Sequence, residues 1–270
     1  MIRRTKREMQ LLQKEMKKVE HQEDRMFYFR REPDEDAGIT GKIRKKIPEK
    51  AMAALEKAFE KGFLFLFEKG DSVIEKTGSL QRAREQWEIY KASLDRMIIP
   101  QTIKAVTRSA SGRVKTSKGV TTAEGSALGI FGIGLPDIPI FLAMLLKTSY
   151  EIAASYGIDY REDEERKYTL ALLKVAFSGG SERLKYSAEC DEIGKNIDDG
   201  DFVDPEITEE DISLVSQVLA TDMLVAKFIQ GITFVGVIGG PLNYRLVHKI
   251  GKVAKVKYKK RFLYRLMKEE

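Results

Sequence analysis

Two carboxylates, Asp137 and Glu151, have the setting that best suits acid–base or metal chemistry. Asp137 is the only charged residue between Gly125 and Leu146, and Glu151 follows it on the same predicted helix. Their separation along that helix is nearly four turns, or about 20 Å. One helix therefore cannot join them as an acid–base pair. We predict that Asp137 caps the helix and that Glu151 is a surface residue or a structural hydrogen-bond partner. A carboxylate-dependent hydrolase that uses both with a metal is the alternative.

Other reactive residue types are few. The chain has one cysteine, Cys190, and two histidines, His21 and His248. It contains no HExxH pattern, no Cys/His zinc set, no P-loop and no complete dinucleotide fingerprint. A Cys190–His248 pair for nucleophilic catalysis requires the two residues to be adjacent in space. We predict no catalytic residue, no cofactor and no metal. A non-enzymatic protein is therefore favoured over an enzyme.

The C-terminal segment combines strong positive charge with apolar residues. Residues 228–244 carry no charge and four glycines, whereas residues 245–268 hold ten Lys or Arg and no acid. A basic amphipathic helix next to an apolar segment is typical of a membrane-surface contact. A solvated charged face is the alternative. The predicted contacts to a membrane or partner are Lys252, Lys255, Lys259, Lys260, Arg261 and Phe262. Asn243, at the start of this segment, is a further structural or functional candidate.

Composition limits the class of protein and partner. Hydrophobic residues make up 43% and charged residues 33% of the 270, which is typical of a soluble globular protein. The formal charge of +6 favours an acidic partner, either an anionic membrane or a nucleic acid. No recognition helix or RNA-binding module is evident, so a nucleic acid is the less favoured partner. The single cysteine and the absence of a signal-peptide pattern predict a cytoplasmic protein, including the inner face of the cell membrane.

The periodic segments all favour helices, and no alternating run predicts a sheet, so the fold class is all-α. We predict a basic amphipathic N-terminal helix and acidic linker over residues 1–41 and a single multi-helix domain over 42–270. Pro48 opens the next helix, which should end at Gly62 or Gly70. Further helices are expected over 78–107, with an interruption at Pro100, and over 137–157. Another should begin within 162–165 and end at 179–180. A capping box formed by Thr208 and Asp211 predicts the start of one more helix. Loops are expected at 32–41, 109–119 and 193–205.

Two apolar, glycine-rich segments interrupt this pattern. Gly125 and Gly129, and likewise Gly236 and Gly240, have the four-residue spacing that lets helices approach closely. Such segments pack in or near a soluble core, or they insert shallowly into a bilayer. Prolines around Asp137 argue against a spanning helix in the first segment.

Two separated blocks of the sequence resemble a known family. They are LPDIPIFLAMLLKTSYEIAASYGID and GVIGGPLNYRLVHKIGKVAKVKYKKRFL, and together they are similar to the EcsC protein family from about residue 47 to 262. The family is named for a bacterial operon whose other products form an ABC transporter. The resemblance implies this neighbourhood but no mechanism. Together with the apolar segments and the basic helix, it favours a non-enzymatic helical protein of unknown molecular activity, peripheral to the membrane or accessory to a transporter complex. It implies no catalytic residues.

Overall fold

The computed structural model describes residues 4–27, 43, 45–75, 78–116, 137–229 and 240–268. Within these residues the chain is all-α, as the sequence predicts, and contains no strand. The predicted linker at 32–41 and the glycine-rich residues 125–136 and 230–239 lie outside the described part. The helices are α1 (Lys6–Phe27), α3 (Glu49–Glu75), α4 (Ser79–Arg96), α5 (Pro100–Thr116), α6 (Asp137–Ser155), α7 (Asp163–Phe177), α8 (Gly180–Asp199), α9 (Glu209–Ile229) and α10 (Gly240–Lys268).

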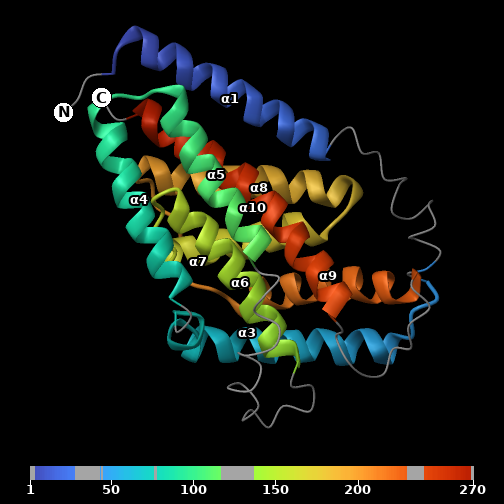
Figure 1. Ribbon diagram of the computed structural model, residues 1–270. Helices are drawn as coiled ribbons and strands as arrows, with labels where there is room; N and C mark the ends of the chain where they lie inside the picture. The colour runs from blue at the N-terminus through green and yellow to red at the C-terminus, as the bar shows by residue number, and fades with distance from the viewer. Residues whose placement is uncertain are drawn as a thin grey trace.

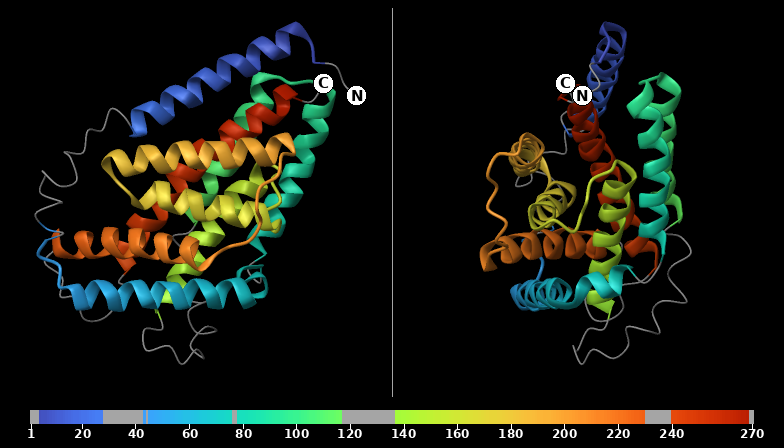
Figure 2. Two further views of the ribbon diagram at one scale, coloured as in Figure 1. Left: turned by 180° about the vertical axis from the view of Figure 1, so that it is seen from behind. Right: turned by 90° about the vertical axis from the view of Figure 1, so that its left-hand side faces the viewer.

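The helices form two layers (Figure 1). In one layer α7 packs between α8 and α9, and α9 packs on α3; in the other, α6 packs against α4, α5 and α10. Contacts from α3 to α6 and from α10 to α7 and α8 join the layers. The two views in Figure 2 show α1 lying across α10 at the end of the molecule that holds both chain termini.

Helix α6 forms the centre of the core, as its apolar spacing predicts. Ile138, Phe141, Leu142 and Leu145 have no exposed surface. By length and composition alone, α6 and α9 could cross a membrane, but 83% of the α6 window and 61% of the α9 window is buried inside the protein. Burial of that extent is typical of core helices.

The C-terminal end of α6 is closed by Gly157, as predicted. Its φ of 73° lies in the left-handed region. The N–H of Gly157 donates to the carbonyl of Ala154, and the N–H of Ile158 donates to that of Ala153. This pair of bonds is a Schellman motif, which satisfies carbonyl groups that the helix end leaves open.

Three predicted boundaries are wrong. Helix α3 does not end at Gly62 or Gly70 but continues to Glu75. Gly62 instead makes room for α6, since a Cβ there would lie 2.7 Å from Leu142 Cδ1. Helix α5 continues to Thr116 through the predicted 109–119 loop, with Ala110 fully buried. Helix α8 continues to Asp199 through much of the predicted 193–205 turn region. Tertiary packing overrides weak local propensity in each segment.

Helix α1 belongs to the same hydrophobic core as the rest of the chain. Leu12, Val19 and Phe27 are buried members of that core. The predicted boundary at residue 41 therefore separates α1 in sequence, whereas in space α1 packs on α10.

A capping box that the sequence analysis missed fixes the start of α1. Thr5 donates its N–H and its hydroxyl to the Glu8 carboxylate, at 2.8 Å each, and the N–H of Glu8 donates to Thr5 Oγ1. The second oxygen of Glu8 accepts the N–H of Ile98 at 2.7 Å, which ties α1 to the α4–α5 junction. The predicted Thr208–Asp211 capping box at α9 is confirmed by the same reciprocal bonds.

These bonds predict a pH-dependent contribution of Glu8 to stability. The N–H groups of Ile98 and Thr5 lower the pKa of Glu8 below its ordinary value. A carboxyl with a depressed folded-state pKa stabilises above its unfolded pKa, and the contribution is lost as pH falls through the folded pKa. Urea unfolding of Glu8→Gln should therefore show a deficit at pH 7 that narrows in acid. A deficit that stays constant with pH would contradict an ionised Glu8.

Candidate functional site

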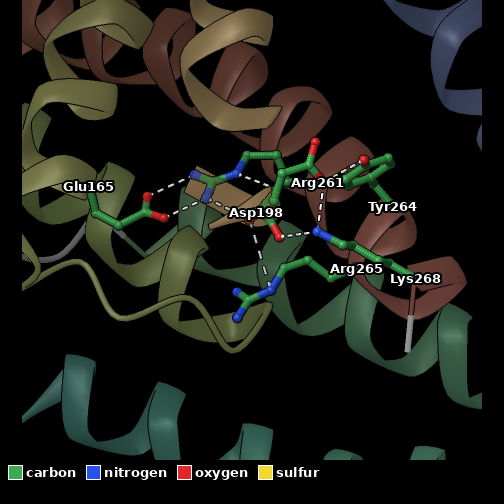
Figure 3. A network of polar contacts seen from close by, with 7 residues as sticks. Glu165, Asp198, Arg261, Tyr264, Arg265 and Lys268 are labelled. Atoms are coloured by element: carbon green, nitrogen blue, oxygen red, sulfur yellow. Dashed lines mark hydrogen bonds and ion pairs between the residues drawn. The ribbon is translucent and has the colours of Figure 1, made fainter. Parts of the chain in front are cut away.

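Arg261 of α10 is the centre of a buried ion-pair network (Figure 3). Its Nη1 and Nη2 donate to the two oxygens of Glu165 at 2.7 and 2.5 Å. Its Nε and Nη2 donate to the two oxygens of Asp198 at 2.9 and 2.8 Å. Glu165 comes from α7 and Asp198 from α8, so one guanidinium joins three helices through bidentate pairs.

The surroundings of Arg261 hold its guanidinium in this geometry. The side chain is 6% exposed, and the guanidinium carbon lies 4.4 Å from the centre of the Tyr168 ring. Gly194 of α8 makes room for it, because a Cβ there would lie 2.8 Å from Arg261 Cδ. Burial acts to lower the pKa of Arg261, but the charges and hydrogen bonds of Glu165 and Asp198 raise it well above its ordinary value. The guanidinium is therefore permanently charged and paired.

A second part of the network clamps α1 and α8 onto α10. Lys257 has no exposed surface; its Nζ contacts Glu23 and donates to Asp191 Oδ1 at 2.7 Å. Lys260 donates to Glu23 Oε2 at 2.9 Å and to Asp191 Oδ2 at 2.8 Å. Lys259 pairs with Glu15 at 3.2 Å. These lysines thus bind helices of their own chain.

The six predicted membrane contacts therefore differ in burial and in pairing. Arg261 and Phe262 are buried, with Phe262 packed against the rings of Trp87 and Tyr156 at 5.9 and 5.3 Å. Their prediction as surface contacts is corrected, because the apolar and charged faces of α10 both meet other helices. Lys259 and Lys260 are half-buried and paired, Lys255 is half-buried, and Lys252 is exposed.

The structure places the carboxylate and amide candidates in separate positions. Asp137 is the first residue of α6 and Asn243 lies in the first turn of α10, and the side chains of both are outside the described part. Glu151 is buried and accepts a hydrogen bond from the Ser79 hydroxyl, which agrees with a structural hydrogen-bond role. Among the described residues no cluster of His, Cys, Asp or Glu could hold a metal ion.

Cys190 is unsuited to nucleophilic catalysis. Its thiol is fully buried, and burial raises its pKa to about 12. The thiolate is the reactive form of cysteine, and it is essentially absent at neutral pH with such a pKa. The Cys190–His248 hypothesis therefore lacks an activated nucleophile.

A pocket of about 320 Å³ lies where α10 meets the α7–α8 turn, the last residues of α1 and the C-terminal part of α9. Phe27, Phe177 and Ile229 form part of its apolar wall. Its polar wall holds Arg183, Asp222, Arg245, His248, Lys249 and Lys252. Sequence reasoning named Lys252, and considered His248 only as a partner of Cys190. It did not bring α10 together with Arg183 of α8 and Asp222 of α9, because these helices are far apart in the chain.

The fold and this network define an all-α protein whose helices are joined by buried ion pairs along a basic C-terminal helix. The chain belongs to the EcsC protein family, whose model matches residues 7–263. The match extends beyond the expected 47–262 and includes α1, which supplies Glu15 and Glu23 to the network.

One curated relative is "Protein EcsC" from Bacillus subtilis (strain 168), which is 26% identical over 144 residues. The matched part covers 53% of this chain and 55% of the relative, so the similarity spans about half the length of each. No solved structure matches.

Proposed function

We propose that this EcsC family protein is a non-enzymatic protein that associates peripherally with the anionic inner surface of the cell membrane. The observation that carries the proposal is the pair of exposed cations Arg245 and Lys252 in the first half of α10. Neither has an acidic partner within the described residues, in contrast to the paired lysines further along α10. A membrane-embedded transporter complex is one place where such association would operate.

Exposed apolar residues adjoin these cations. Ile229, the last residue of α9, is 59% exposed and Tyr244 is 43% exposed. Between them the sequence carries no charge. Exposed apolar and aromatic side chains beside free cations form the combination that anionic lipid interfaces favour.

The arrangement of α6 and α10 adds a second argument. The two helices pack side by side, run in the same direction, and begin at the end of the molecule opposite the chain termini (Figures 1 and 2). Each follows an uncharged glycine-rich segment in the sequence. Two apolar segments that are far apart in the chain therefore lead into helix starts at the same end.

Vesicle co-sedimentation tests the proposal. The protein should bind vesicles that contain phosphatidylglycerol and not vesicles of phosphatidylcholine alone. Binding should weaken as salt rises from about 0.05 M to about 0.5 M, because salt screens exposed charges. Binding that resists salt would show that apolar insertion dominates. Absence of binding at low salt would overturn the proposal.

A further inference from the structure

We infer that the pocket between α10 and the α7–α8 turn binds a phosphate group. Its lining carries four cationic side chains, Arg183, Arg245, Lys249 and Lys252, against one carboxylate, Asp222. A concave site with this charge excess attracts a small anion more strongly than a flat surface does. The inference goes beyond membrane association, because it concerns one phosphate group, whichever molecule carries it.

Two of the four cations are already engaged. Lys249 donates to Asp222 Oδ1 at 2.7 Å and lies 5.6 Å from the centre of the Phe177 ring. Arg183 donates its Nε to the Ser178 carbonyl at 2.8 Å, which fixes the turn before α8. Arg245 and Lys252 have no ionic partner in the described part of the chain. The positive charge of the pocket is therefore not neutralised by the protein itself.

The start of α8 adds hydrogen-bond donors to the same wall. Ser178 and Gly179 line the pocket, and the helix begins after Gly179 without a side-chain cap. The first N–H groups of a helix and its dipole favour an anion. Ser178 is only 5% exposed, and its hydroxyl has no hydrogen-bond partner among the described residues. An oxyanion would satisfy donors that the protein leaves open.

The remaining lining suits a ligand with a small apolar part. Phe27, Val225 and Ile229 also line the pocket. A pocket of about 320 Å³ is at the lower end of the range for small-molecule sites. It would hold a phosphate with a glycerol-sized group, and both a lipid headgroup and a soluble phosphate ester have that chemistry.

Isothermal titration of the full chain tests this inference with three probes: inorganic phosphate, glycerol phosphate and a short-chain phosphatidate. Saturable binding of at least one probe is expected. Tighter binding of phosphatidate identifies a lipid headgroup as the source, whereas equal or tighter binding of glycerol phosphate identifies a soluble ester. No saturable binding of any of the three overturns the inference.

A matched pair of double variants assigns the binding to this pocket. Arg245→Gln with Lys252→Gln should weaken phosphate binding at least about tenfold, since both charged donors are lost. Lys104→Gln with Arg108→Gln, on exposed positions of α5, makes the same change in net charge outside the pocket. It should leave the affinity unchanged. Equal weakening by both variants would overturn the assignment.

The outcome separates this inference from the proposed function. Vesicle binding without titratable phosphate binding would retain membrane association and remove the pocket. Phosphate binding without vesicle binding would retain the pocket and remove membrane association.

Discussion

Replacing Arg261 with Met is expected to lower the free energy of unfolding by about 3 to 5 kcal/mol. The substitution keeps most of the apolar stem but removes the guanidinium from Glu165 and Asp198, whose side chains are 5% and 2% exposed. Two carboxylates would then be buried without the charge that compensates them. Loss of one partner costs far more than the net value of an intact buried pair.

Arg265→Met is the matched control for this prediction. Arg265 lies four residues later on α10, is 45% exposed and approaches the same Asp198 at 3.9 Å. Exposed ion pairs contribute at most about 1 kcal/mol, so urea unfolding should show a small loss for this variant. Similar losses for the two variants would show that burial of the Arg261 network does not determine its contribution.

Replacing Gly157 with Ala should cost about 3 kcal/mol, from two sources. A left-handed conformation costs a residue with a Cβ about 1 kcal/mol or more. The new Cβ would also lie 2.1 Å from Cε2 of Trp87, so the indole must shift. Trp87 packs edge-on against Phe262, and repacking a filled core adds about 1 to 3 kcal/mol.

Gly200→Ala separates these two sources. Gly200 ends α8 with a φ of 75°, but a Cβ there would have nothing within 4 Å. Thermal or urea unfolding should therefore show only the backbone cost in Gly200→Ala, about 1 kcal/mol. Equal losses in the two alanine variants would contradict the steric role of Trp87.

Local chemistry determines the parts of the fold that the sequence predicts well. Gly157 and the Thr208–Asp211 box are short-range features, and their geometry follows from residue type alone. The apolar spacing of α6 likewise predicts its buried face. Helix lengths are harder to predict from sequence, because α5 and α8 continue through small, polar or acidic residues that tertiary contacts keep helical.

The burial of the basic residues of α10 is hard to predict from sequence for a related reason. A run of lysines resembles a surface face until the carboxylates that pair with it are known, and these lie on α1, α7 and α8. A sequence signal for them does exist. Glu15 and Glu23 of α1 are eight residues apart and Asp191 and Asp198 of α8 are seven apart, so the members of each pair lie near one helix face. Complementary acidic faces therefore mark where a basic helix is buried.

We propose that Arg245 and Lys252, which have no acidic partner in the described part of the chain, bind an anionic membrane, while the paired cations of α10 stabilise the fold. Arg245→Gln with Lys252→Gln removes the unpaired cations without touching the buried network. Each basic residue near anionic lipid contributes about 1 kcal/mol, so the two together account for about a 30-fold change in vesicle partitioning.

The most direct test measures the partition coefficient of this double variant on phosphatidylglycerol vesicles at low salt, beside Lys104→Gln with Arg108→Gln. The account predicts about a 30-fold loss for the α10 variant and only a small loss for the α5 variant. Equal partitioning of the two variants would contradict it.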